Sequence, residues 1–229
     1  DVASDVYKGE SEPRTEFDFL LNKVLAVIKD VLFAHTAAFF WANNEKQQMV
    51  CEAKVSDSAN FMSARRFPMQ HDIVSKIAQQ SKPEIISRVN PVSEHELLPY
   101  YNDPEYIKSF VGVPVFFQNP LDKNKQDTVA VIAIDSKTEE AFGHETLLLL
   151  GQFTKLISGL IKSYTDKYDL LLDAELLNSI HRFQEKIRND LSTNTITQSL
   201  VDESSKLLKW DFISIVLQDE NKQAWLVKK

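Results

Sequence analysis

The side chains in this sequence that are best suited to chemistry are a lone thiol and two histidine-containing segments. Cys51 is the only cysteine among the 229 residues. A thiol can sense oxidants, but a lone cysteine in a strand is more often a small buried hydrophobic residue. One cysteine forms no intrachain disulfide, so the sequence predicts a buried Cys51 and a reducing compartment, the cytoplasm.

The two histidine-containing segments suggest a metal site and a phosphoacceptor. Glu94, His95 and Glu96 have metal-ligating types, but adjacent residues on a short helix point in different directions and make a poor chelate. The sequence therefore predicts a solvated turn there and no metal. His181 lies in the segment 180–183, which lacks the following Glu and downstream Pro typical of histidine kinases, so we expect a surface histidine.

No other pattern predicts catalysis. With five glycines in the whole chain there is no glycine-rich phosphate loop, and no Ser/His/Asp arrangement can be nominated. We therefore expect no catalytic residue in this chain and no enzyme activity. A catalytic output domain in a longer protein stays open.

The net charge and the hydropathy of the chain argue against nucleic acid as a partner and against a membrane-spanning helix. The net charge of −7 and the isoelectric point near 5.3 argue against nucleic acid, which needs clustered Lys and Arg. No apolar run approaches the roughly 20 residues of a membrane-spanning helix. A hydrophobic content of 43% is ample for a core.

Hydrophobic periodicity predicts the elements that position these residues. Helical spacing predicts an amphipathic helix over 16–34 and a short helix over 73–80 with Asp72 as its cap. Ser93 and Glu96 have capping-box spacing for a small helix. The predicted strands are 36–42, 48–55, 84–89, 110–117 and 129–135. Pro114 within one of them suggests an edge or a bulge.

The order of these elements predicts an α+β fold, an α/β sandwich. Neighbouring strands form antiparallel hairpins, and the terminal helices must cover one face of the sheet. The insertion 56–106 then covers the opposite face. We expect this first domain to span 16–165.

A long helix is predicted over 144–191, because 48 residues pass without a proline. Its apolar residues follow steps of three and four, which fits a seam between two chains. We expect a homodimer through Leu150, Phe153, Ile157, Leu160, Tyr164, Leu176, Ile180, Phe183 and Ile187. In the alternative interpretation, the first half of the helix covers the sheet and the second half packs on a second domain.

The segment 192–229 repeats the start of the chain. An amphipathic helix over 196–208, with Thr195 and Gln198 at capping-box spacing, precedes two short strands. A shift of 175 residues aligns this order with the first helix and hairpin. We expect the truncated start of a second copy of the domain, and hence a piece of a longer protein.

The distributed motifs of the chain resemble the GAF domain, a small-molecule sensor module. The most telling segments are 109–115 (SFVGVPV) and 131–137 (VIAIDSK), followed by 142–145 (FGHE). The segments 66–68, 72–78 and 82–86 also fit. The resemblance covers about 17–165 completely and about 172–229 in part. At 136–145 the cyclic-nucleotide signature of the family is degenerate, which argues against that ligand.

The resemblance implies a pocket between the sheet and the insertion. Its candidate lining is Phe39, Trp41, Arg66, Phe67, Ile86, Tyr100, Tyr101, Tyr106 and Phe110. Aromatic walls with a few polar anchors suit a small planar ligand, with Arg66 as a partner for an anion. The alternative is that the aromatics simply fill the space.

The resemblance also bears on cofactors and catalysis. Bilin-binding members attach the chromophore through a cysteine beside a histidine, and Cys51 lies in a strand outside that region. The branch that reduces free methionine sulfoxide needs several cysteines. We therefore expect neither bilin, haem nor metal, and interpret the chain as a non-catalytic sensory module. The competing hypothesis is a structural dimerisation module with a filled pocket.

Overall fold

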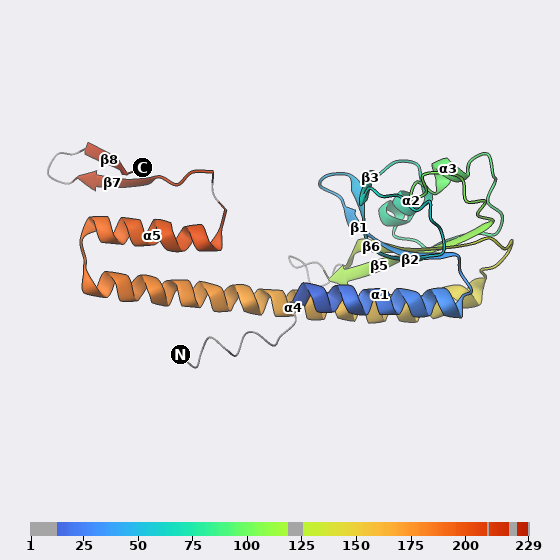
Figure 1. Cartoon of the computed structure of the whole chain (residues 1–229), viewed down its shortest axis with the longest axis horizontal. Helices are drawn as coiled ribbons and strands as arrows, with labels where there is room; N and C mark the ends of the chain where they lie inside the picture. Colours follow the sequence, from blue (N-terminus) through green and yellow to red (C-terminus); the bar gives the residue numbers. More distant parts are fainter. Residues whose placement is uncertain (1–12, 119–125, 210, 220–223, 229) are drawn as a thin grey trace. The chain divides into compact units, whose positions relative to one another are not determined.

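The structure is a computed structural model that describes residues 13–118, 126–209, 211–219 and 224–228 (Figure 1). Within it, the chain divides into two compact units between Thr165 and Asp166. The helix α4, His144–Asn189, begins in the first unit and ends in the second. The predicted long helix is thus present.

The first unit is built on a six-stranded antiparallel sheet with the strand order β3-β2-β1-β6-β5-β4. Its strands are β1 (Thr36–Asn43), β2 (Gln48–Ser56), β3 (Arg66–Pro68), β4 (Glu84–Ile86), β5 (Ser109–Gln118) and β6 (Gln126–Ser136). The near-continuous apolar run of β6 places it at the centre, where it pairs with both β1 and β5. The expected α+β fold is confirmed.

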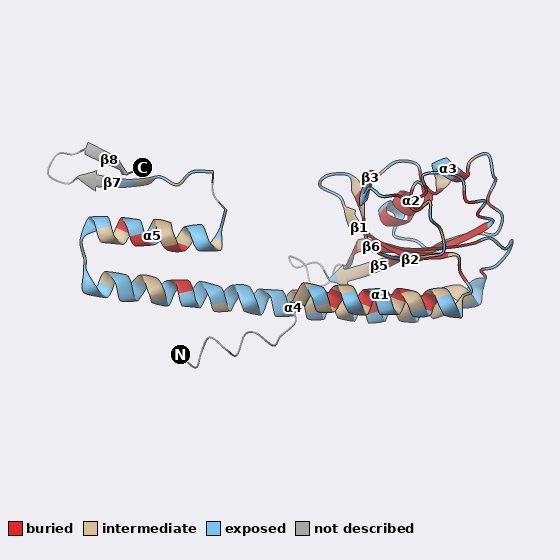
Figure 2. Ribbon diagram, in the orientation of Figure 1, coloured by how far each residue is buried: buried red, intermediate tan, exposed pale blue. Residues whose placement is uncertain are grey.

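Helices cover one face of this sheet. They are α1 (Pro13–Val31) and the first part of α4, and Figure 2 shows buried residues recurring along α1. The core between them holds Phe17, Leu21, Leu25 and Ile28 of α1 with Leu150, Ile157 and Ile161 of α4.

The insertion covers the other face, as predicted. The helix α2 (Ile73–Gln80) buries Ile73, Val74 and Ile77 against the sheet, and α3 (Glu94–Leu97) follows. Asp72 caps α2 as expected, since its carboxylate accepts hydrogen bonds from the Ser75 amide (2.8 Å) and hydroxyl (2.6 Å). The strands β3 and β4 extend the two edges of the sheet.

The structure tests two local predictions, one for Pro114 in β5 and one for Ser93 before α3. Pro114 lies on β5 beyond the three residues that pair with β4, so no β4 residue is opposite the position where proline lacks an N–H. A register shift in the pairing with β6 follows between Val115 and Phe116. Ser93 is the N-cap of α3, as its spacing predicts, but its side chain makes no capping hydrogen bond, so the expected capping box is absent there.

The predicted dimer seam needs a correction in the first half of α4. Leu150 and Ile157 are fully buried, and Phe153, Leu160 and Tyr164 pack on the same core. Spacing of three and four residues marks an apolar stripe without saying what covers it, and here the chain's own sheet does. In the second half, Leu176 and Ile180 are 46% and 44% exposed, while Phe183 and Ile187 are half-buried.

The second unit contains the end of α4, α5 (Thr193–Leu207) and a hairpin of β7 (Ile215–Asp219) and β8 (Ala224–Lys228). The carboxylate of Glu203 on α5 is buried and pairs with Arg182 (2.8 Å) and Lys186 (3.3 Å) on α4. The cap of α5 is Ser192, which accepts from the Thr195 amide, rather than the predicted Thr195. The two short strands expected after this helix are present as β7 and β8.

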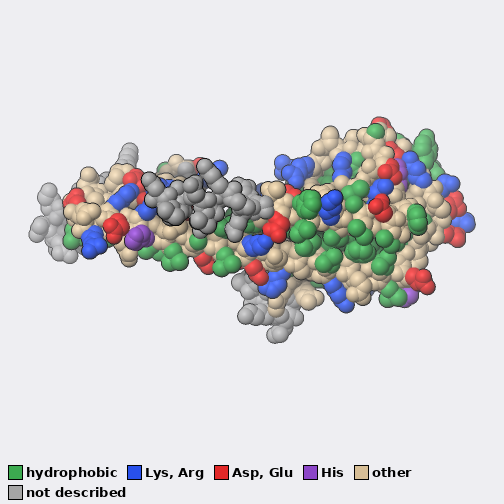
Figure 3. Space-filling view, turned by 60° about the horizontal axis from the view of Figure 1, so that its bottom comes forward, with side chains coloured by type: hydrophobic (Ala, Val, Ile, Leu, Met, Phe, Trp, Pro, Cys, Tyr) green, Lys and Arg blue, Asp and Glu red, His purple; other side chains and the backbone are tan. Residues whose placement is uncertain are grey.

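Apolar side chains also lie on the outer surface of the helix layer in the first unit. Figure 3 shows hydrophobic side chains gathered on this face. Its large exposed apolar residues are Phe19, Val27 and Val31 on α1 and Leu148 and Leu156 on α4. None of the described helices is long and apolar enough to cross a bilayer.

Two glycines offer opposite tests of this packing. A Cβ on Gly112 of β5 would lie 2.4 Å from the Ile77 side chain and 2.9 Å from Phe110, so Gly112→Ala should cost about 1–3 kcal/mol. Gly159 of α4 has no atom within 4 Å of such a Cβ, and Gly159→Ala should stabilise by about 0.5–1 kcal/mol. Urea unfolding measures both; equal effects would contradict the close approach of α2 to β5.

Candidate functional site: a cleft in the insertion

A cleft of about 540 Å³ opens in the insertion that covers the sheet. Three segments form it: the edge strand β3, the residues leading into α2, and the stretch from Ser93 to Pro99 around α3. Its lining consists of Phe67, Pro68, Gln70, His71, Asp72, Ser93, His95, Glu96, Leu97 and Pro99. This size is within the range of small-molecule sites.

The cleft combines apolar and hydrogen-bonding side chains. Two prolines, Phe67 and Leu97 supply apolar surface, while Gln70, two histidines and Glu96 supply donors and acceptors. The Asp72 carboxylate is already engaged by Ser75. No three His, Cys, Asp or Glu side chains among the described residues are placed to hold a metal ion. The arrangement suits a small polar organic molecule.

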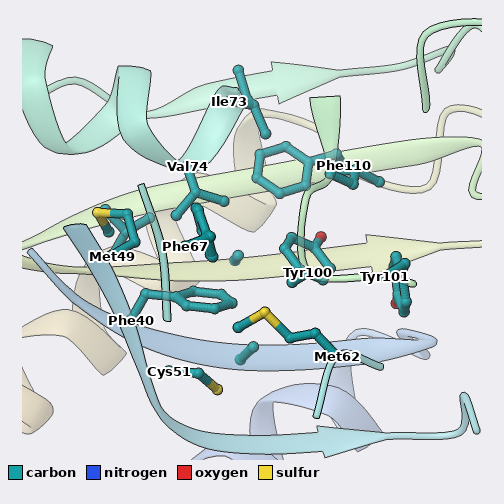
Figure 4. Close-up of a cluster of buried hydrophobic side chains, with 14 of the residues drawn as sticks. Phe40, Met49, Cys51, Met62, Phe67, Ile73, Val74, Tyr100, Tyr101 and Phe110 are labelled. Atoms are coloured by element: carbon teal, nitrogen blue, oxygen red, sulfur yellow. The ribbon is translucent and has the colours of Figure 1, made fainter. Parts of the chain in front are cut away.

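Aromatic side chains fill the space beneath the cleft. Phe40 lies 5.6 Å from Phe67 and 5.5 Å from Tyr100 between ring centroids, and Phe61 stacks on Tyr100 at 5.5 Å. Figure 4 shows the rings of Phe40, Phe67 and Tyr100 with Ile73 and Val74 of α2 directed into the same cluster. Ring distances of 4.5–7 Å are those of packed aromatic pairs. This part of the implied pocket is therefore occupied by the chain itself.

The structure separates the nine predicted pocket residues into groups. Phe67 lines the cleft, and Tyr100, Tyr101 and Phe110 are buried in the cluster beneath it, with Ile86 at its margin. The other four, Phe39, Trp41, Arg66 and Tyr106, lie elsewhere.

Phe39 and Trp41 require a correction. They belong to the core on the helix side of the sheet. There the ring centroid of Trp41 is 4.9 Å from that of Phe39 and 6.1 Å from that of Phe17. Alternate residues of a strand point to opposite faces, so Phe40 is the residue of this run that faces the insertion. The sequence run is apolar throughout and does not distinguish the two faces.

Arg66 and Tyr106 also do not line the space. Arg66 is exposed on β3, and the Tyr106 side chain is 73% exposed. Of the polar lining residues, sequence reasoning considered His95 and Glu96 only as metal ligands and missed Gln70 and His71. The polar residues just before the α2 cap were the available signal.

A buried carboxylate anchors the segment that follows α3. Glu94 accepts hydrogen bonds from the backbone amides of Glu105 (2.9 Å), Tyr106 (3.1 Å) and Ile107 (3.1 Å). Tyr106 has a φ of 60°, an unusual conformation for a bulky residue that this carboxylate holds in place. The predicted solvated turn is therefore wrong for Glu94.

A second carboxylate ties the insertion to the end of the sheet. Glu105 accepts from Ser58 (2.5 Å) and Asn60 (2.9 Å) and pairs with Lys137 (3.0 Å) and His35 (3.2 Å). Its burial acts to raise the pKa, but these donors outweigh it and hold the pKa at about 2. Glu105 is therefore ionised at neutral pH.

Cys51 is buried, as predicted. Burial raises the pKa of its thiol to about 11, so the reactive thiolate is scarce at neutral pH. It borders a smaller hollow of about 340 Å³. This environment is that of an unreactive cysteine.

Glu94 and Glu96 form a matched pair for testing the anchor. Glu94→Gln replaces one acceptor oxygen with a donor and leaves a buried amide unpaired, which should cost about 1–3 kcal/mol. Glu96 is exposed, and Glu96→Gln should change stability by less than about 0.5 kcal/mol. Chemical unfolding distinguishes them; a neutral Glu94→Gln would contradict the anchoring role.

Comparisons with known proteins identify the fold. No protein-family model and no curated protein matches the sequence. Among solved structures, the chain is similar to a type II free methionine-R-sulfoxide reductase from Thermoplasma acidophilum, at 16% identity and a TM-score of 0.52, covering 66% of this chain and 96% of that one.

Two further solved structures match with nearly the same TM-score. The GAF domain of an Acinetobacter phosphoenolpyruvate-protein phosphotransferase has 15% identity and a TM-score of 0.51, over 67% of this chain and 86% of that one. A methyl-accepting chemotaxis protein has 19% identity and a TM-score of 0.51, over 65% of this chain and 90% of that one. With the six-stranded sheet and its two covering layers, these similarities establish that this chain contains a domain of the GAF fold.

Proposed function

We propose that this chain is a non-catalytic sensory module that binds a small molecule in the cleft of its GAF-fold domain. The single observation that carries the proposal is the cleft itself, with an apolar wall and a rim of amide, imidazole and carboxylate groups. Similar structures include a GAF domain of a phosphotransferase and a chemotaxis protein, and this likeness supports a regulatory role.

The single thiol argues against one kind of catalysis, the thiol-dependent reduction of methionine sulfoxide. One similar structure is a methionine sulfoxide reductase, and a disulfide-forming cycle needs a second cysteine that this chain lacks. Cys51 is moreover buried with a raised pKa. A lone reduced cysteine also favours the cytoplasm as the location of the module.

Transmission would run through α4 in a homodimer. The outer face of the helix layer carries five exposed large apolar residues. Leu156, Leu170 and Leu177 are exposed on α4 and separated by multiples of seven residues, which is the spacing of a helix pairing with another helix. The segment 192–229 would be the start of a second such domain.

The cleft can be tested by filling it. Native mass spectrometry of the purified chain should show added small-molecule mass on the wild type. Gln70→Trp, which fills the cleft, should abolish this mass, and Gln79→Trp on the exposed side of α2 should retain it. A wild-type chain that carries no mass and gains none from a metabolite mixture would contradict the sensor proposal.

Dimerisation can be tested by making the same change, valine to glutamate, separately at two exposed positions. Val27→Glu places a charge on the outer helix face and should shift the mass measured by light scattering from dimer to monomer. Val92→Glu changes an equally apolar but remote loop residue and should leave the dimer intact. A wild-type monomer at micromolar concentration would contradict the dimer.

The second candidate function is a structural dimerisation module without a ligand. The observation in its favour is the aromatic filling of the cluster beneath the cleft. A bare dimer, with Gln70→Trp as stable as the wild type, would support this function over the sensor.

A further inference from the structure

Asp135, at the end of β6, is an acidic residue buried inside the first unit. It has no solvent exposure, and its Oδ2 accepts hydrogen bonds from the hydroxyl groups of Tyr100 and Tyr101, both at 2.9 Å. Its Oδ1 is also buried and has no hydrogen-bond partner among the described residues. A buried carboxylate with one unpaired oxygen carries a substantial desolvation cost when ionised.

The two tyrosines connect Asp135 to the cleft. They follow directly after Leu97 and Pro99, which line the cleft. Tyr101 also shares a hydrogen bond with Thr36 of β1 at 2.5 Å. Together with Thr36, Asp135 therefore supplies the polar contacts by which the sheet holds the two tyrosines of this segment.

The surroundings favour the neutral form of Asp135. Burial raises its pKa to about 7, and the negative charge of Glu105 acts in the same direction, while the tyrosine hydroxyls and a hydrogen bond from the Thr36 backbone oppose it. On β5 its cross-strand neighbour is the apolar Phe110.

Of the other titratable groups near this cluster, Glu105 stays ionised and the two tyrosines stay neutral between pH 4 and 7. Glu105 has a pKa of about 2 and its partner His35 has a lowered pKa, chiefly through burial. The hydroxyl pKa of Tyr101 is raised, again chiefly by burial. Lys137 pairs with Glu105, and Glu94 acts on Tyr100 through its charge.

We propose that Asp135 is a proton-binding switch that controls how firmly the cleft segment 97–107 is held against the sheet. With its proton, the carboxyl remains buried beneath the tyrosines. Without it, the charge is relieved when the segment opens and water reaches the carboxylate. Opening exposes Asp135 to solvent, where it ionises readily, so opening is linked to loss of one proton.

The direction of the pH dependence comes from this linkage. The closed form binds the proton up to about pH 7, and the open form releases it near its ordinary pKa of 3.8. Opening therefore becomes easier as pH rises from about 4 to 7, by up to about tenfold per pH unit, and levels off above 7. A rise in pH would loosen the cleft wall, a consequence for ligand binding that rests on the proposed function.

Amide hydrogen exchange of the full chain, corrected for the intrinsic pH effect, tests the switch without any ligand. The reporters are the Met62 amide, which donates to the Tyr100 carbonyl (2.8 Å), and the Asn102 amide, which donates to the Asn60 carbonyl (2.9 Å). Between pH 5.5 and 7 their protection should fall by up to about tenfold per unit and then level off. A cleft that binds nothing would leave this outcome unchanged.

Two variants make the test specific. Asp135→Asn keeps the shape and removes the titration, so the protection of both amides should become independent of pH. Asp103→Asn removes an exposed carboxylate from the same segment and should retain the wild-type profile. The same pH dependence in wild type and Asp135→Asn would overturn the proposal.

A direct titration covers the case in which Asp135→Asn fails to fold. The carboxyl carbon of Asp135 in the wild-type chain, followed by NMR, should titrate near pH 7. A midpoint below about 5 would overturn the proposal, because the residue would then be ionised throughout the physiological range.

Discussion

The first unit depends on the burial of β1 and β6 on both faces of one sheet. Successive residues of β1 therefore belong to two different cores: Phe39 faces the helices and Phe40 faces the insertion. Each face needs its own cover, and α1 with α4 supplies one while the insertion supplies the other. The cleft lies within the second cover, where short elements and loops replace long helices, as is common for binding sites.

The insertion is held by buried carboxylates as well as by apolar packing. Glu94 accepts from three consecutive backbone amides, Glu105 pairs with side chains from three segments of the chain, and Asp135 accepts from two tyrosines. Such contacts fix a loop-rich segment at few points, because each depends on a single side chain. A segment held in this way can respond to a ligand or a proton by changing one contact, whereas the helix-covered face must be repacked as a whole.

The helix α4 has two different surroundings along its length. In the first unit its apolar stripe is covered by the sheet, and in the second unit several of its leucines are exposed. A signal can pass along such a helix only if the ligand binds two arrangements of it with unequal affinity. The helix α4 packs on one face of the sheet, and the cleft segment packs on the opposite face. Any coupling between the cleft and α4 must therefore pass through the sheet.

The sequence by itself determined most of the elements and their order, since local periodicity and capping chemistry mark five strands of the sheet, the Asp72 cap and the long helix. It did not predict the edge strand β3 (Arg66–Pro68), because three residues are too few to show a period. It also determined that the fold is α+β with a covered sheet. Only the tertiary structure decided which partner each apolar stripe meets: Leu150 and Ile157 were equally suited to a second chain, but their own sheet covers them. The same holds for Phe39, because an apolar run does not mark which face of the sheet each residue joins. Glu94 and Asp135 became significant only when folding brought distant amides and hydroxyls to them, and no spacing along the chain encodes such contacts.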